Sequence, residues 1–324
     1  MGMLIDGKWT DQRPADVAGR FIRPESQFRN VITADGSSGF KAEPDRYHLY
    51  VAYGCPWAHR TLIFRKLKGL EGMISLSVAI PGNRENGWEF AGHFPGSSAD
   101  AVNGFNYMYQ AYAAVKPDYT GTATVPVLWD KKTRTIVNNE SPEIIRMFNS
   151  AFDAIGARRG DYYPAPLRGE IDRVNEFVYH HINNGVYRTG FAATQDAYDE
   201  AVQTVFTGLD TLEQRLAGQR YLAGDTITEA DWRLFVTLVR FDAVYHALFK
   251  CNLRPVSGYP NLHHYLLDLY QVPGVAETVK LDHIVIGYYR NSRVNPNGII
   301  PRVPEIDFTR PHDRGRFGQA RSAA

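Results

Sequence analysis

The residue best placed to do chemistry is Cys55, in the run Gly54-Cys55-Pro56-Trp57. A short β-rich run at 47–53 precedes it and an apolar pattern typical of a helix follows it. A cysteine at such a junction faces free backbone N–H groups and the positive end of the helix dipole, which together favour the nucleophilic thiolate. The alternative is a chemically inert, buried cysteine. The strand-to-helix context favours the reactive one.

The chain offers this cysteine no redox partner. A thioredoxin-type pair needs Cys-x-x-Cys, and Ala58 stands at the second position. An external thiol must therefore resolve any disulfide that Cys55 forms. The other cysteine, Cys251, lies far away in an apolar segment, where we expect an inert residue. The presence of only two cysteines, far apart in the sequence, argues against a disulfide framework and predicts a reducing, cytoplasmic location.

Two further sites have the residue types of a ligand clamp. Val125-Pro126 begins a predicted strand, where a proline marks an edge or a special turn, in cis or in trans, and leaves the Val125 backbone able to pair with a peptide. Glu140-Ser141 begins a predicted helix and offers a carboxylate, a hydroxyl and free N–H groups to the charged ends of an amino acid. Alternatively, Glu140-Ser141 is only a helix cap.

The elements around these residues predict an α/β domain followed by an all-α domain. A second strand at 73–80 completes a βαβ unit whose strands run parallel. A hairpin at 125–130 and 135–137 leads into a helix with Ser141 as N-cap and Pro142 at its first position. The tract 81–120 is too long for a simple connection, so we expect a functional insertion or lid there, with Trp88 as a candidate contact.

The change of pattern along the chain predicts the domain boundaries. The second domain is expected to be all helical, and its helix near 228 starts with the capping-box-like Thr228-Glu229-Ala230-Asp231. Residues after 291, rich in Pro, Gly and Arg, are expected to form a solvated tail. The predicted parts are an extended N-terminal arm at 1–44, an α/β domain at 45–155 with its insertion at about 81–120, a helical domain at 165–290 with helices at 168–183, 195–217, 228–249 and 261–271, and a tail at 291–324.

Composition narrows the class of partner. The 36 basic and 35 acidic residues give a formal net charge of +1 without a basic block, so neither nucleic acid nor an anionic membrane is an expected partner. The first residues lack the apolar core of a signal peptide, and no apolar run of about 18 residues occurs, so we expect a soluble protein. The 19 tyrosines suit either an aromatic-ligand pocket or an ordinary core.

Taken together, the motifs resemble the glutathione transferase superfamily, and within it the glutathionyl-hydroquinone reductases, or Xi class, over nearly the whole chain. The resemblance implies a thioredoxin-like N-terminal domain, an all-helical C-terminal domain, a homodimer, glutathione as co-substrate and no metal. It is carried by Cys55-Pro56-Trp57-Ala58-His59-Arg60, Glu85-Asn86-Gly87-Trp88, Thr124-Val125-Pro126-Val127-Leu128-Trp129-Asp130, Asn139-Glu140-Ser141, Asn184-Gly185-Val186-Tyr187, Thr228-Glu229-Ala230-Asp231 and Arg240-Phe241-Asp242.

The resemblance also implies roles for single residues. Glutathione would be held by Trp88, Val125, Pro126, Glu140 and Ser141, and the aromatic ring of the second substrate by Tyr187, Tyr245 and Tyr288. Each tyrosine can equally be core. One departure from the family stands out, because Thr122 lies where an arginine is usual. The missing cationic contact to glutathione would then come from elsewhere, for example from Arg84 or Lys116.

The implied reaction removes glutathione from a glutathionyl-hydroquinone through a mixed disulfide between Cys55 and glutathione. Tyr187 or Tyr288 would polarise the ring oxygen. Two alternatives use the same fold differently. One is a glutaredoxin-like thiol transferase or dehydroascorbate reductase that employs the same cysteine. The other is a non-catalytic scaffold of the glutathione transferase type.

Overall fold

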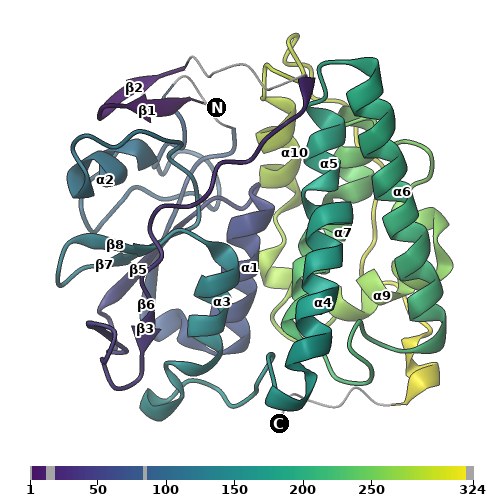
Figure 1. Cartoon of the computed structure of the whole chain (residues 1–324), viewed down its shortest axis with the longest axis horizontal. Coiled ribbons are helices and arrows are strands. Elements are labelled where there is room, and N and C mark those ends of the chain that lie inside the picture. The colour runs from purple at the N-terminus through teal and green to yellow at the C-terminus, as the bar shows by residue number, and fades with distance from the viewer. Residues whose placement is uncertain (1, 12–18, 83–85, 319–324) are drawn as a thin grey trace. The chain divides into compact units, whose positions relative to one another are not determined.

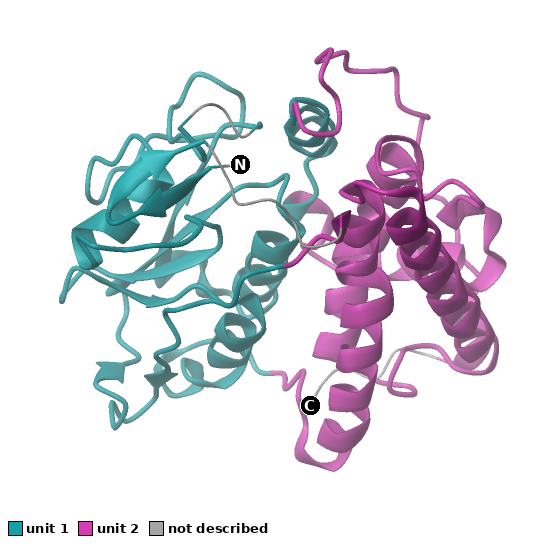
Figure 2. Cartoon of the chain, turned by 45° about the horizontal axis from the view of Figure 1, so that its top comes forward, with its two compact units in different colours: residues 1–14, 23–159, 278–291 teal, residues 15–22, 160–277, 292–324 magenta. Residues whose placement is uncertain are grey.

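The computed structural model describes residues 2–11, 19–82 and 86–318, in two compact units (Figure 2). Unit 1 comprises residues 1–14, 23–159 and 278–291, and unit 2 comprises 15–22, 160–277 and 292–324. The last helix of unit 1, at 281–289, falls within the range that the sequence assigned to the helical domain. Its residue contacts place this helix in unit 1, the unit that contains the four-stranded sheet.

Unit 1 is built on a mixed four-stranded sheet with the order β6-β5-β7-β8. Strand β5 pairs in parallel with β6 and antiparallel with β7, which pairs antiparallel with β8. This is the predicted βαβ-then-ββα order of a thioredoxin-like domain. All five residues of β5 are buried, as expected for a central strand covered on both faces. The strands are β5 (Tyr47–Val51), β6 (Ile74–Val78), β7 (Val127–Asp130) and β8 (Thr135–Asn138).

Helices cover both faces of this sheet (Figure 1). α1 (Pro56–Leu67) and α3 (Ser141–Ser150) pack together on one face, and α2 (Met108–Val115) lies on the other, in contact with β8. α2 falls inside the tract 81–120, where the sequence predicted only an insertion or lid. The spacing of its buried residues Met108, Ala111 and Tyr112 is helical. The sequence analysis did not predict this helix, because it lies in an aromatic-rich tract without a clear apolar period.

The smaller elements of unit 1 occupy its edges. The N-terminal arm, which was expected to be extended, contains a hairpin and a short strand that pairs in parallel with a following one. Among these elements are β1 (Met3–Ile5), β2 (Lys8–Thr10), β3 (Ile32–Thr33), β4 (Phe40–Lys41), α10 (Leu281–Tyr289) and short 3₁₀ turns at Leu70–Gly72 and Asp153–Ile155.

Unit 2 is helical, as predicted. The predicted capping box is confirmed, because the Thr228 N–H donates to Asp231 Oδ2 over 2.8 Å at the start of α7. Its helices are α4 (Arg168–Val178), α5 (Gly185–Gly190), α6 (Gln195–Gly218), α7 (Glu229–Arg240), α8 (His246–Leu248) and α9 (Pro260–Tyr270), with π-helical turns at Tyr179–Asn183 and Phe241–Tyr245 and 3₁₀ turns at Ala165–Leu167, Val256–Gly258 and Arg314–Phe317. In the described part of the chain, no helix combines the length and the apolar character needed to cross a membrane.

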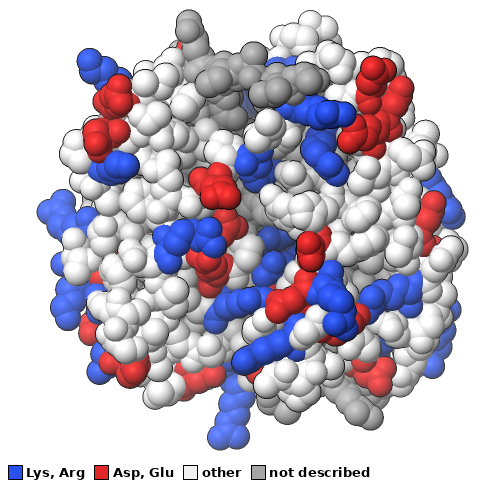
Figure 3. Space-filling model, in the orientation of Figure 1, with Lys and Arg blue, Asp and Glu red and all other residues white. Residues whose placement is uncertain are grey.

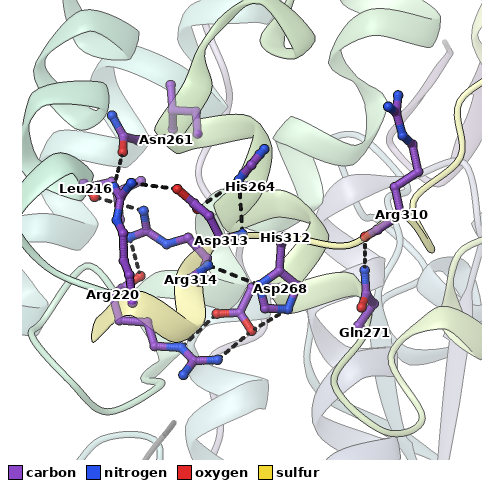
Figure 4. Close-up of polar contacts among 12 residues, drawn as sticks. Leu216, Arg220, Asn261, His264, Asp268, Gln271, Arg310, His312, Asp313 and Arg314 are labelled. Atoms are coloured by element: carbon purple, nitrogen blue, oxygen red, sulfur yellow. Dashed lines mark hydrogen bonds and ion pairs between the residues drawn. The ribbon is translucent and has the colours of Figure 1, made fainter. Parts of the chain in front are cut away.

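The C-terminal segment differs from the solvated tail that the sequence predicted. Arg314 is fully buried and donates to the carbonyl oxygens of Leu216 (2.9 Å) and Arg220 (3.0 Å), near the end of α6 (Figure 4). Leu216 lies in the last turn of α6 and Arg220 lies just beyond that turn. Carbonyls at a helix C-terminus lack intrahelical donors, so the arginine satisfies them and complements the helix dipole. Asp268 of α9 also accepts a bidentate pair of hydrogen bonds from Arg220. The composition of this segment, which is rich in Pro and Arg, does not indicate that one of its arginines is buried and anchors it to unit 2.

Arg314→Ala is therefore expected to lower the free energy of unfolding by about 2–3 kcal/mol, because buried carbonyls lose their donor. Chemical denaturation monitored by circular dichroism measures this change. The matched control is Arg302→Ala, which removes an exposed arginine from the same segment and should leave stability unchanged. Equal stability of both variants would contradict this role for Arg314.

Candidate functional site

Cys55 lies at the junction that the sequence predicted. It is the N-cap of α1, with Pro56 in the first turn and no acidic residue there, and only 9% of the cysteine is exposed. Its Sγ is 3.5 Å from the Val125 carbonyl oxygen, so two of the predicted site residues are in contact. The Val125-Pro126 peptide bond is cis. A thiol at the N-terminus of a helix lies at the positive end of the helix dipole, which stabilises a thiolate.

The two cysteines have different surroundings. Cys251 is fully buried in unit 2, and burial raises the pKa of its thiol to about 12. A thiol with such a pKa is protonated at neutral pH and is a poor nucleophile. Neither cysteine forms a disulfide bond. Cys55 is therefore the residue with the better geometry for thiol chemistry.

Helix α10 packs directly on the turn that holds Cys55. A Cβ atom built on Gly54 would lie 3.1 Å from the His283 carbonyl oxygen and 3.9 Å from the Gly287 Cα. The next residue of α10 is Tyr288, which is 9% exposed. The absence of side chains at Gly54 and Gly287 thus allows α10, with Tyr288, to approach the turn.

Gly54→Ala should disturb this contact, because the added methyl group meets backbone rather than a movable side chain. We expect a loss of about 1–3 kcal/mol in unfolding free energy, the usual cost of overpacking. Thermal unfolding of the variant measures it. Gly72→Ala is the matched control, since a Cβ there has no atom within 4 Å. If Gly54→Ala were as stable as the control, the contact between α10 and the turn would not be as close as described.

The residues at the start of α3 leave polar groups available. The sequence predicted Ser141 as N-cap, but the cap is Glu140, because its backbone is extended and Ser141 is already helical. The Glu140 carboxylate accepts a hydrogen bond from Ser26 Oγ over 2.9 Å. Ser141 is 2% exposed, and its hydroxyl has no hydrogen-bond partner among the described residues. A buried hydroxyl without a partner costs free energy, so it is a natural position for a ligand group.

The remaining predicted contact of unit 1 is Trp88. It is half-buried, and its carbonyl oxygen accepts a hydrogen bond from the Met108 N–H over 2.9 Å, which ties it to the start of α2. Of the two alternative cations, Lys116 is exposed at the end of α2, and Arg84 lies outside the described residues. Thr122 is half-buried.

Tyr187 and Tyr245 belong to unit 2, where they lie in an aromatic cluster. Their ring centroids are 6.2 Å apart, and Tyr245 is fully buried whereas Tyr187 is 8% exposed. Aromatic neighbours at such distances contribute to the core as well as to any ring-binding surface. The cluster comprises Phe21, Tyr187, Phe191, Tyr245 and Phe249.

Sequence reasoning missed a histidine beside the cysteine turn. His283 of α10 is 1% exposed, and its Nε2 lies 2.7 Å from the Pro95 carbonyl oxygen. Its ring makes edge contacts with Tyr53 and Phe94, at centroid distances of 5.2 and 4.9 Å. His283 therefore joins α10 to the tract 81–120. Because His283 and Pro95 are 188 positions apart, no local sequence pattern predicts their contact.

Neither the surface charge nor the metal-ligating residues of the described chain indicate a further site. Lys and Arg side chains intermix with Asp and Glu over the face drawn in Figure 3. Within residues 2–11, 19–82 and 86–318, no group of three or more His, Cys, Asp or Glu side chains is arranged to hold a metal ion.

Comparison with known proteins places these features in a family. Models described as the glutathione S-transferase N-terminal domain and C-terminal domain match residues 54–151 and 195–267. The chain is 55% identical to the glutathionyl-hydroquinone reductase YqjG of Escherichia coli, over 98% of this chain and 100% of the relative. It is 53% identical to the glutathionyl-hydroquinone reductase PcpF of Sphingobium chlorophenolicum, over 94% and 96% of the two chains.

Solved structures agree. The glutathione-bound structure of YqjG matches with a TM-score of 0.90 at 53% identity, covering 97% of this chain and 99% of the other. A Xi-class glutathione transferase from Natrialba magadii matches with a TM-score of 0.92 at 47% identity, covering 98% and 97%.

Proposed function

Since the chain belongs to the glutathionyl-hydroquinone reductases, the Xi class of the glutathione S-transferases, we propose that it reduces glutathionyl-hydroquinones with glutathione and uses Cys55 as nucleophile. The observation that supports this role is the placement of a single thiol at the start of α1, in contact with the Val125 carbonyl. A single thiol suits a reaction that ends with an external thiol, and glutathione is that thiol.

The first step transfers the glutathionyl group to the enzyme. The Cys55 thiolate attacks the glutathione sulfur of the substrate and forms an S–S bond while the S–C bond to the ring breaks. The electron pair of the broken bond goes to the ring carbon, which takes up a proton. The products are the hydroquinone and a mixed disulfide of Cys55 with glutathione.

The second step regenerates the enzyme. The thiolate of a second glutathione attacks the sulfur of the bound glutathione, and the bond to Cys55 breaks. Oxidised glutathione leaves, and Cys55 returns to the thiolate. The two electrons that reduce the ring carbon therefore come from two glutathione sulfurs, which end as one disulfide.

Glutathione is proposed to bind through groups of unit 1. The Val125 backbone, whose carbonyl oxygen lies 3.5 Å from Cys55 Sγ, would pair with the peptide. The start of α3 would take the amino-acid end, with the Glu140 carboxylate on the ammonium group and the Ser141 hydroxyl on the carboxylate. The buried Ser141 hydroxyl, which has no partner among the described residues, supports this assignment. Trp88 would cover the ligand from the tract 81–120.

The ring of the second substrate is proposed to contact three tyrosines. A phenol can donate a hydrogen bond to the ring oxygen as charge develops there, and Tyr187 and Tyr288 are the candidates for this donation. Tyr245, whose ring centroid lies 6.2 Å from that of Tyr187, is proposed as a further contact of the substrate ring. We also propose a cytoplasmic location, in keeping with two cysteines that form no disulfide bond. The homodimer is proposed from the family resemblance.

The experiment is a comparison of substrates on the purified protein. Glutathionyl-hydroquinone, dehydroascorbate and a glutathione mixed disulfide are each supplied with glutathione, and product is followed by liquid chromatography. We expect the quinone thioether to be converted with the highest kcat/KM. Preference for dehydroascorbate or the mixed disulfide would replace this function with that of a thiol transferase. Inactivity toward all three would indicate a non-catalytic scaffold.

A further inference from the structure

The N-terminal hairpin β1–β2 is bonded to the segment that leads to Val125. Leu4 and Gly121 exchange backbone hydrogen bonds of 2.8 and 2.9 Å. The Gly7 N–H donates to the Tyr119 carbonyl over 3.0 Å. The hairpin is therefore bonded to residues shortly before Val125, a proposed glutathione contact.

Trp9 of the same hairpin contacts α2 and the backbone next to Trp88. Its indole stacks on Tyr109 of α2, with centroids 5.1 Å apart and an interplanar angle of 24°. A Cβ built on Gly87 would lie 2.8 Å from the indole Cη2, so the ring lies directly against the backbone that precedes Trp88. The backbone at Trp88 therefore has two contacts. The Trp9 ring lies against the preceding residue, Gly87, and the Trp88 carbonyl oxygen accepts the hydrogen bond from Met108 of α2. The hairpin therefore connects residues 119–121, which lead to Val125, with the loop at residues 86–88, which contains Trp88 and is called the Trp88 loop below.

A second part of the arm lies against Glu140. Phe28 and Asn139 are paired, since the Asn139 N–H donates to the Phe28 carbonyl over 3.1 Å and the Phe28 N–H donates to Asn139 Oδ1 over 3.3 Å. This pairing places Ser26 where its hydroxyl donates to Glu140 Oε2 over 2.9 Å. A carboxylate has acceptor capacity on both oxygens, so Ser26 fixes the orientation and leaves Oε1 able to accept from a ligand.

We propose that Trp9 and Ser26 are positioning residues of the glutathione site, Trp9 for the Trp88 loop and Ser26 for the Glu140 carboxylate. The inference rests on the proposed function, because it assumes that Trp88 and Glu140 contact glutathione. The arm is then part of the binding site rather than only a wrapping around the fold. Neither side chain takes part in the chemistry, so their loss should affect the binding of glutathione and leave kcat nearly unchanged.

The test measures glutathione affinity by titration calorimetry, together with KM and kcat, for Ser26→Ala and Trp9→Ala. We expect the Kd and the KM for glutathione to rise roughly threefold to tenfold, as the loss of one hydrogen bond or one aromatic contact would give. The kcat should stay within about twofold, because the transition state loses no contact of its own. Ser26→Thr keeps the hydroxyl and should restore the affinity.

Controls separate this result from loss of the fold. Ile5→Ala alters the same hairpin at a side chain that is 46% exposed, and it should bind glutathione as the unaltered protein does. Thermal unfolding is recorded for each variant, and Trp9→Leu, which fills space without an aromatic ring, replaces Trp9→Ala if the latter does not fold. Unchanged Kd values in Ser26→Ala and the folded Trp9 variant would overturn the inference while leaving the proposed function intact. If the unaltered protein itself neither bound glutathione nor turned over, both would fall.

Discussion

Replacing Cys55 by alanine is expected to lower the rate of glutathionyl-hydroquinone reduction by about a thousandfold or more, because the covalent step then has no nucleophile. Binding of glutathione should persist, since the groups proposed to hold it remain. The measurement is kcat/KM with a glutathionyl-hydroquinone and glutathione, beside calorimetric titration with glutathione alone.

Two further variants test the basis of this expectation. Cys55→Ser keeps a hydroxyl in contact with Val125, yet it should also be inactive in the reduction, because a serine forms no mixed disulfide. Cys251→Ser is the matched control at the other free thiol and should retain activity. Activity of Cys55→Ala close to that of the control would contradict the mechanism.

Asp231→Ala is expected to lower the free energy of unfolding by about 3–5 kcal/mol, because it leaves several buried donors without an acceptor. The carboxylate is fully buried and accepts from the Leu222 N–H, the Thr228 N–H and the Tyr265 hydroxyl, each over 2.8 Å. Burial raises the pKa of Asp231, and these hydrogen bonds offset part of the rise. Its contribution to stability thus comes from the donors it satisfies.

Urea unfolding followed by circular dichroism measures the loss. Asp231→Asn keeps one acceptor oxygen and should fall between alanine and the unaltered protein. Asp225→Ala serves as control at an exposed aspartate of the same connection. A loss under about 1 kcal/mol in Asp231→Ala would show that the capping box is not what stabilises the start of α7.

The sequence predicted those parts of the fold that local patterns specify. A β-rich run, a proline at the first helical turn and an apolar period are enough to place Cys55 at the start of α1. The same reasoning fails where the signal is diluted. Helix α2 was missed because the Gly and Asn residues before it obscured the helical spacing of Met108, Ala111 and Tyr112.

Contacts between distant segments had no signal at all. Ser26 and Glu140 are 114 positions apart, and nothing in either local sequence indicates that they meet. The buried anchor Arg314 was overlooked for the same reason, because its partners lie almost 100 positions away, at and just after the end of α6. The roles of Trp88 and Val125 were argued from local pattern and from family resemblance, whereas those of the three tyrosines came from the resemblance alone. All of them remain predictions about binding.

The most direct test of the mechanism is to trap its intermediate. The protein is mixed with one equivalent of a glutathionyl-hydroquinone in the absence of free glutathione, quenched with acid, and examined by intact and peptide mass spectrometry. The mechanism predicts one glutathione added to Cys55, none on Cys251, and release of an equal amount of hydroquinone. Release of hydroquinone with no glutathione on Cys55, or glutathione found on Cys251 instead, would contradict it.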